Sequence, residues 1–354
     1  MSVVDTARLA SLDPDLLSAP FPWPGGKSRA AALIWERFGD VVNYVEPFAG
    51  SLAVLLGRPL PFTGSETAND INGYIANAWR AIAADPQAVA YHADWPVNEI
   101  DCTARHAWLV GQREDLVERL MGDPDFFDAK IAGRWLHGIS SWIGSGYCSG
   151  NGPWQSTDGR LVDTRQLPHL SGTQGATRQL PHLSGTQGVT RQLPNIGNNG
   201  KGTESPAAPQ LYAWMEALAA RLRQVRVTCG DWRRVLGKSP TFGLGLTAVL
   251  LDPPYEGFEG LYEGASDVAS DVRTWAISAG KNPLMRIALC GYDEHDGAMP
   301  TGWTKATWKA GGGYGNQRKD GSNENRHKET IWFSPHCIPP RQRGLFDDAF
   351  EVAE

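Results

Sequence analysis

Short apolar runs that stop at an acidic residue recur along the chain and predict buried strands. Residues 41–45 precede Glu46, Thr247–Leu251 precedes Asp252, and another parallel strand is expected to end near Asp70. Apolar runs without polar alternation are typical of strands covered on both faces. A helical pattern at 29–38 precedes the first of these strands, and helical patterns at 52–56 and 73–84 follow the strands that end near Glu46 and Asp70. This alternation predicts an α/β fold with a mostly parallel sheet.

The remaining elements continue the same pattern with one long interruption. Further helices are expected over 103–120, 125–140, 211–223 and 267–279, and strands over 225–228 and 285–289. A closing hairpin is expected from 303–308 and 329–333. The segment from about 91 to 205 departs from the sheet pattern, which indicates an insertion into the α/β domain.

Composition narrows the class of protein without naming a function. The chain has 354 residues and a net charge of −6, which opposes a strong non-specific nucleic-acid binder but allows local basic patches. Five scattered cysteines without a paired spacing predict thiols in a reducing cytosol and no metal site. Neither a signal pattern nor an apolar run of about 20 residues is present, so we expect a soluble, cytoplasmic protein.

The motif Asp252-Pro253-Pro254-Tyr255 carries the clearest chemistry. Prolines cannot donate to a sheet ladder, so the strand ends here and presents a carboxylate, two carbonyls and an aromatic ring. Asp252 and the Pro253 carbonyl suit the two N–H groups of an exocyclic amine on a flat heterocycle, and Tyr255 suits its ring face. These acceptors would ready the nitrogen to attack an electrophile. A plain strand-to-turn boundary is the alternative.

Three further stretches predict a ligand site at the strand ends. Gly25-Gly26-Lys27 precedes a helix, so its backbone can approach a ligand closely and Lys27 can hold an anion, expected to be a carboxylate. Glu46 and Gly50 follow the first strand in a nucleotide-binding strand–turn–helix pattern. Asp70 stands where such folds place the acid that accepts hydrogen bonds from ribose hydroxyls. An ordinary loop remains the alternative for Gly25-Gly26-Lys27.

Four motifs in this order resemble the Dam-like DNA adenine N6-methyltransferases. They are Trp23-Pro24-Gly25-Gly26-Lys27, Glu46-Pro47-Phe48-Ala49-Gly50, Asn69-Asp70-Ile71-Asn72 and Asp252-Pro253-Pro254-Tyr255. The resemblance spans about 20–90 and 206–335. It implies a doubly wound, Rossmann-like sheet, the cofactor S-adenosyl-L-methionine, and site-specific methylation of a flipped adenine in double-stranded DNA.

The resemblance also implies roles for individual residues. Trp23 and Lys27 would contact the cofactor, Asp70 its ribose, and Asp252 would lie between cofactor and target base. The expected cofactor-binding residues are Trp23, Gly25, Gly26, Lys27, Glu46, Phe48, Gly50, Asp70, Asp231 and Asp252, and the catalytic set is Asp252, Pro253, Pro254 and Tyr255. Leu52 departs from the family, because many relatives carry a second glycine there.

Two polar segments are candidates for DNA contact. A 13-residue repeat begins at Arg165, recurs at Arg178 and decays after Arg191. Its Arg, Gln, His, Ser and Thr side chains can reach phosphates and base edges, although a duplicated surface linker explains it equally well. The long connection of the closing hairpin carries the second set, Asn316, Arg318, Lys319 and Arg326, with a solvated hairpin tip as the alternative.

These observations predict the following organisation. A leader (1–18) precedes a cofactor-binding part (19–90), a target-recognition insert (91–205, repeats at 165–194), a second catalytic part (206–340) and an acidic tail (341–354). We expect an adenine-specific DNA methyltransferase in a bacterial or phage-infected cell, a monomer or weak dimer, with no membrane partner and an unknown cognate nuclease. The alternatives are methylation of an RNA base or a protein glutamine, or a non-catalytic DNA-binding relic.

Overall fold

The computed structural model describes residues 17–23, 25–141, 147–148, 154–157, 160–163, 208–254, 265–292, 299–307 and 329–340. Its centre is a seven-stranded sheet in the order β5-β2-β1-β6-β7-β9-β8. The strands are β1 (Asn43–Glu46), β2 (Ser65–Asp70), β5 (Val225–Cys229), β6 (Thr247–Leu251), β7 (Met285–Tyr292), β8 (Thr304–Thr307) and β9 (Glu329–Phe333). Strands β5, β2, β1, β6 and β7 are parallel, and β9 is antiparallel to both of its neighbours. The predicted α/β, mostly parallel, Rossmann-like sheet is confirmed.

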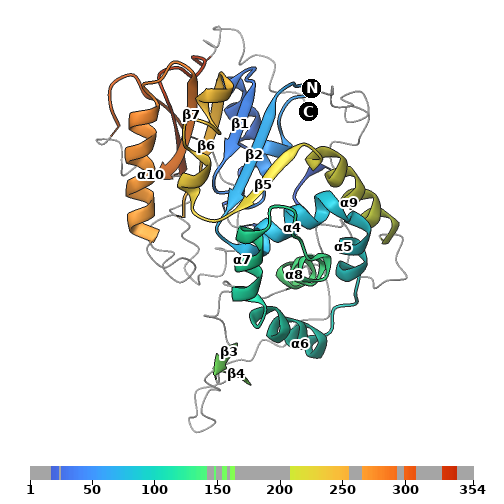
Figure 1. The fold of residues 1–354 in the computed structure, drawn as a ribbon. Coiled ribbons are helices and arrows are strands. Elements are labelled where there is room, and N and C mark those ends of the chain that lie inside the picture. The colour runs from blue at the N-terminus through green and yellow to red at the C-terminus, as the bar shows by residue number, and fades with distance from the viewer. Residues whose placement is uncertain are drawn as a thin grey trace, which may run out of the picture.

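Helices cover the two faces of this sheet. They are α2 (Ala31–Phe38), α3 (Ala53–Leu56), α4 (Gly73–Ala84), α5 (Pro86–Ala93), α6 (Glu99–Val110), α7 (Arg113–Gly122), α8 (Ala129–Ser141), α9 (Ala208–Leu222) and α10 (Ala265–Ala279), with 3₁₀ turns η2 (Trp232–Val235) and η3 (Phe242–Leu244). Figure 1 shows α10 next to β6 and β7, whereas α4 to α9 gather beside β5.

Two apolar clusters lie on opposite faces because successive strand residues point to opposite sides. Tyr44 and Leu250 belong to the cluster with α2, α3, α4 and α9. Their chain neighbours Val45 and Val249 belong to the cluster with η2 and α10. Every residue of β6 is buried, as the uninterrupted apolar run predicted. The central strands are therefore fixed from both sides, and their carboxyl ends are held rigidly.

The helices between β2 and β5 form a unit around α8. In Figure 1, α8 lies among α4, α5, α6 and α7, and it packs against α4, α5 and α6. The crossing of α5 and α8 is close, because a Cβ on Gly133 would lie 2.4 Å from the Cβ of His92. The expected single helix over 103–120 is wrong. It is two helices, interrupted at Gly111 and Gln112, because α6 packs on α8 whereas α7 packs on α4.

Two hairpins lie at the periphery. Strands β8 and β9 pair antiparallel, which confirms the closing hairpin, although β9 also pairs with β7. Its connection, 308–328, lies outside the described residues. A second antiparallel pair, β3 (Trp154–Thr157) and β4 (Arg160–Asp163), lies below α6 in Figure 1, and β3 contacts that helix. The sequence pattern did not predict this pair.

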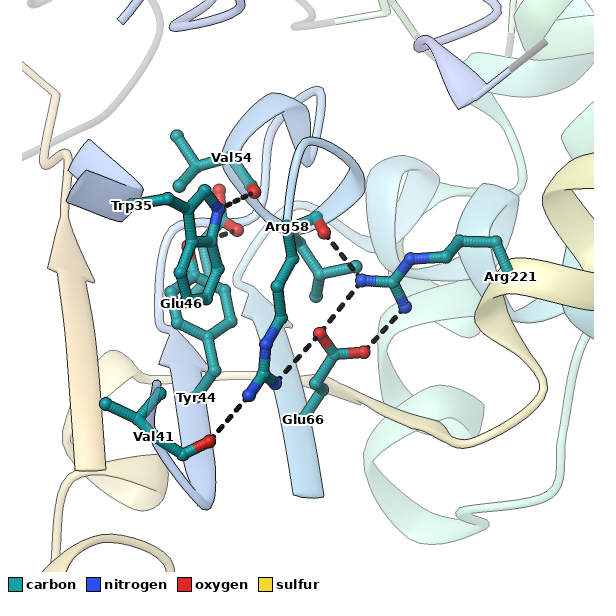
Figure 2. A network of polar contacts seen from close by, with 9 residues as sticks. Trp35, Val41, Tyr44, Glu46, Val54, Arg58, Glu66 and Arg221 are labelled. Atoms are coloured by element: carbon teal, nitrogen blue, oxygen red, sulfur yellow. Dashed lines mark hydrogen bonds and ion pairs between the residues drawn. The ribbon is translucent and has the colours of Figure 1, made fainter. Parts of the chain in front are cut away.

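A buried ion network ties the helical layer to the sheet (Figure 2). The Glu66 carboxylate of β2 receives two hydrogen bonds from Arg221 of α9, at 2.6 and 2.8 Å, and one from Arg58 at 3.3 Å. Arg58 also donates to the Val41 carbonyl at 2.6 Å, and Arg221 to the Leu55 carbonyl at 2.6 Å. The network therefore joins β2, α9, α3 and the start of β1.

Three further findings concern the cysteines, possible metal ligands and possible membrane helices within the described residues. All five cysteines lie in this part of the chain, and none of them forms a disulfide. The described ranges contain no group of three or more His, Cys, Asp or Glu side chains placed to hold a metal ion. Within the same ranges, no helix combines the length and apolarity needed to cross a bilayer.

Candidate active site

The candidate site lies where the strand order reverses direction. From β1 the chain proceeds outward to β2 and β5, whereas from β6 it proceeds the other way to β7. Open α/β sheets bind ligands outside the carboxyl ends of the strands at such a switch point. Here β1 ends at Glu46, and β6 is followed directly by Asp252. The two acids expected from the sequence therefore meet at the reversal.

Asp252 forms an ion pair with Lys27. The Lys27 Nζ lies 2.9 Å from the Asp252 Oδ2, and it also donates to the Gly25 carbonyl at 2.7 Å. The Lys27 side chain is 3% exposed and that of Asp252 21% exposed, so the carboxylate is the partner that reaches the surface of the site. Gly25 has φ +75°, a conformation that favours glycine. The carboxylate that Lys27 contacts here belongs to Asp252, and the expected contact of Lys27 with the carboxylate of a cofactor stays a prediction.

Glu46 is a buried acid beside this pair. It is 3% exposed, and the Tyr44 hydroxyl donates to its Oε2 at 3.0 Å. Burial raises the pKa of Glu46 to about 8; the Tyr44 hydrogen bond opposes the shift, and the Asp252 carboxylate adds to it. At neutral pH the Glu46 carboxyl is therefore mostly protonated. A cation placed beside it would lower this pKa again.

Asp70 joins the loops that follow β1 and β2. Its Oδ2 accepts the Gly50 N–H at 3.0 Å, and its Oδ1 accepts the Asn72 N–H at 2.8 Å. Burial raises the pKa of Asp70 to about 6, and both backbone hydrogen bonds oppose the shift. The acid that the sequence assigned to a ribose is therefore also a support for the Gly50 turn.

Asn69, to which the sequence assigned no role, fixes three strand ends together. Its Nδ2 donates to the Pro47 carbonyl at 3.0 Å, after β1, and to the Gly230 carbonyl at 2.9 Å, after β5. The only signal in the sequence was the position of Asn69 before Asp70 in the motif Asn69-Asp70-Ile71-Asn72. Trp79 was missed in the same way: it is fully buried on α4, and its Nε1 donates to the Gly50 carbonyl at 2.9 Å.

Trp23 packs against the turn after β1. Gly50 has φ +45°, and a Cβ there would lie 2.6 Å from the Trp23 Nε1. A Cβ on Gly26 would lie 3.3 Å from the Trp23 carbonyl oxygen and 3.6 Å from the Ser51 Oγ. The first motif loop and the Gly50 turn are therefore in direct contact, and their glycines permit the approach. The contacts above link Trp23, Gly25, Gly26, Lys27, Gly50, Asp70 and Asp252, and Glu46 interacts with Asp252 through its charge.

Leu52 has a left-handed backbone, with φ 52° and ψ 24°, a conformation that favours glycine, and its side chain is fully buried. A side chain costs about 1 kcal/mol or more in this conformation. We therefore expect Leu52→Gly to be about 1 kcal/mol more stable than Leu52→Ala, although both remove the buried leucine side chain.

Leu55, also fully buried but helical on α3, is the matched control for that comparison. There Leu55→Gly should be about 1 kcal/mol less stable than Leu55→Ala, the usual helical order. Urea denaturation measures the free energy of unfolding of all four variants. The same order at both positions would contradict the strain at Leu52.

Phe48 and Asp231 lie at the edge of this constellation. The Phe48 ring centroid is 6.2 Å from that of Trp232 on η2. The Asp231 Oδ1 accepts the Arg233 N–H at 2.8 Å, and its Oδ2 pairs with the Arg233 guanidinium at 3.2 Å. Asp231 adjoins Gly230, whose N–H donates to the Asp70 carbonyl at 3.0 Å. None of these contacts joins Phe48 or Asp231 directly to Lys27, Asp70 or Asp252. Their contact with a cofactor stays a prediction.

The structure describes the first three residues of the catalytic motif. Asp252 is partly exposed, Pro253 is buried and Pro254 is partly buried. Tyr255 lies outside the described residues. The same holds for every residue predicted to contact DNA, namely Arg165, Arg178, Arg191, Asn316, Arg318, Lys319 and Arg326. Their roles stay predictions.

A comparison with known protein families indicates the function of this site. Residues 23–98 match the family model described as D12 class N6 adenine-specific DNA methyltransferase. The match is confined to this segment and is consistent with the Dam-like family that the motifs resemble. The matched segment of this methyltransferase contains Lys27, Glu46 and Asp70, and Asp252 joins them by its ion pair from outside the match. The comparison with curated proteins returned no match.

The family assignment confirms the expected activity, methylation of adenine N6 in DNA. It gives no support to the alternatives of an RNA base, a protein glutamine or a relic without activity. The division of the methyltransferase into a catalytic domain and a recognition insert stays a prediction.

Proposed function

We propose that this methyltransferase transfers a methyl group from S-adenosyl-L-methionine to the N6 of a specific adenine extruded from double-stranded DNA. The Lys27–Asp252 ion pair at the switch point carries the proposal, because it links the cofactor-side loop to the acid expected to meet the base. Sequencing of modified bases in a host that expresses the protein tests it. N6-methyladenine should appear within one short sequence motif, and its absence, or its appearance without sequence preference, would refute the proposal.

The donor set fits this cofactor. S-Adenosyl-L-methionine carries a sulfonium, an ammonium, a carboxylate and ribose hydroxyls, and when bound it supplies an electrophilic methyl group. Glu46, Asp70 and Asp252 offer carboxyl groups at the carboxyl edge of β1, β2 and β6, and Gly26 and Gly50 allow the first motif loop to pack against the turn after β1. Trp23 is placed against the same turn. These residues would hold the cofactor.

Asp252 and the Pro253 carbonyl would align the target amine. Extrusion of the adenine costs a few kcal/mol, and stacking on Tyr255 would return about 1–3 kcal/mol. Asp252 and the carbonyl would accept hydrogen bonds from the two N6–H groups and point the nitrogen lone pair at the methyl group. Lys27 holds one carboxylate oxygen of Asp252 in place. Most of the acceleration then comes from positioning, because the methyl group is already activated.

Binding of the cofactor should release a proton from Glu46. Its pKa of about 8 keeps the carboxyl protonated at about pH 7, and a cation beside it favours the carboxylate. Calorimetric titration in buffers with different ionisation enthalpies measures the released proton. The release should be large near pH 7 and should vanish above about pH 9, where Glu46 is already ionised.

Glu46→Gln is the control for this linkage, because it keeps the shape of the side chain and cannot ionise. It should bind the cofactor more weakly and show no proton release near pH 7. Proton release of the same size in both proteins would assign the linkage to another group and would count against Glu46 as a cofactor contact.

A further inference from the structure

One surface of the helical unit combines positive charge with an exposed and a partly exposed aromatic ring. We name it the cationic-aromatic face, and its members are Trp95, Arg105, Trp108, Lys130 and Arg134. They come from α6, α8 and the connection between α5 and α6. Trp95 is 41% exposed, and the ring of Tyr91, 57% exposed, lies 6.3 Å from it. None of these residues belongs to the candidate active site.

The cations of this face are stacked on its rings. The Arg134 Cζ lies 4.4 Å from the ring centroid of Trp108, and the Lys130 Nζ lies 5.2 Å from the same ring. The Arg105 Cζ lies 5.2 Å from the ring centroid of Trp95. A guanidinium stacked on an indole keeps its in-plane N–H groups available for a phosphate.

The positive charge of the face is not neutralised locally. Among the residues that the structure describes, Arg105, Lys130 and Arg134 have no carboxylate within 4.0 Å. Burial lowers the pKa of Arg134, and Arg105 adds to this effect more than Asp128 opposes it. The Asp128 Oδ1 already accepts the Ile131 N–H at 2.8 Å, at the start of α8. Such an excess of cations is notable on a chain whose net charge is −6.

A buried histidine holds two members of the face in place. His137 of α8 is fully buried; its Nδ1 lies 3.5 Å from the Arg105 Nη1, and its Nε2 lies 3.1 Å from the Trp95 carbonyl oxygen. Burial and the nearby Arg105 lower the pKa of His137 to about 4, so its ring is neutral at physiological pH. A neutral ring can accept from Arg105 and donate to Trp95 at once. The face is therefore supported from beneath.

We propose that the cationic-aromatic face binds the phosphate backbone of the DNA substrate, with Arg105, Lys130 and Arg134 as the phosphate contacts. The inference rests on the DNA substrate of the proposed function and adds a surface outside the methyl-transfer site. Phosphate contacts position a duplex without reading its sequence. The face shares α6 with the contact to β3, so the hairpin and the face are presented by one helix.

The test compares two triple variants with the same change in net charge. Arg105→Gln/Lys130→Gln/Arg134→Gln removes the face. Arg223→Gln/Lys238→Gln/Lys281→Gln removes exposed cations from the amino-terminal side of the sheet, before β5, β6 and β7. Fluorescence anisotropy measures the affinity for a labelled duplex of about 30 base pairs over a range of salt concentrations.

The face variant should bind DNA at least 10-fold more weakly at low salt, on target and scrambled duplexes alike. Its slope of log affinity against log salt should shrink by about 0.9 for each phosphate that the variant no longer neutralises. The KM for DNA should rise while kcat at saturating DNA stays unchanged. Lys130→Gln alone, at an exposed position, should show a smaller effect of the same kind without perturbing the helices.

Affinity and salt slope equal to those of the control triple variant would overturn the inference, and would leave the face as a site for another kind of partner. This result is distinguishable from failure of the proposed function. In that case the unmodified protein itself would transfer no methyl group to DNA.

Discussion

Asp252→Ala should reduce methyl transfer to adenine at least about 10³-fold, because the target amine loses the acceptor that aligns it. Asp252→Asn should lose less, since it keeps one carbonyl acceptor of the same reach. Cofactor binding by calorimetry should weaken but remain measurable in both variants, because Asp70 and the Gly50 turn are unchanged. Single-turnover transfer of a labelled methyl group measures the effect. Retention of more than a tenth of the activity in Asp252→Ala would refute the assignment.

The Lys27–Asp252 ion pair adds a stability effect that must be separated from catalysis. Removing the carboxylate leaves the buried Lys27 ammonium without this partner, at a cost of about 1–3 kcal/mol. The double variant Lys27→Met/Asp252→Ala also removes the Lys27 ammonium and should regain most of that stability. It should remain inactive. Recovery of activity together with stability would mean that Asp252 serves the fold and not the reaction.

Glu66→Ala should destabilise the protein by about 3–5 kcal/mol, the largest stability effect we expect. The substitution removes the carboxylate that two buried guanidinium groups, Arg58 and Arg221, both contact (Figure 2). Glu66→Gln should cost less, because an amide oxygen still accepts one hydrogen bond. Urea denaturation of both variants measures the free energy of unfolding.

The matched control is an exposed ion pair on α7. The Asp115 Oδ2 lies 3.8 Å from the Arg119 Nη1, and both side chains are more than half exposed. Asp115→Ala should therefore change stability by no more than about 0.5 kcal/mol. A cost below about 1 kcal/mol for Glu66→Ala would show that the two arginines find other partners, and that the network does not hold α9 to β2.

The sheet could be predicted from local sequence because its strands carry their own signals. The run Thr247–Leu251 has the bounds of β6, and the acids at the end of β1 and directly after β6 mark strand ends. Helix α4 has the expected bounds, since Asn72 caps its first turn with a bond to the Tyr74 N–H. The departure from the family pattern at Leu52 coincides with an unusual backbone conformation, because Leu52 is left-handed.

The features that the sequence did not predict depend on contacts between distant segments. The division of 103–120 into α6 and α7 follows from packing on two different helices, which no local periodicity encodes. The pairing of Lys27 with Asp252, and the bonds from Asn69 to two neighbouring strand ends, require the assembled sheet. The cationic-aromatic face was not foreseen for the same reason, because its cations come together only when α6 crosses α8.

The most direct test of the central claim is the chemical identity of the product. The protein is incubated with methyl-labelled S-adenosyl-L-methionine and a DNA duplex, the DNA is digested to nucleosides, and the label is located by mass spectrometry. We predict label in N6-methyl-2′-deoxyadenosine with the unmodified protein and none with Asp252→Ala. Label on cytosine, or equal label on adenine with both proteins, would contradict the account.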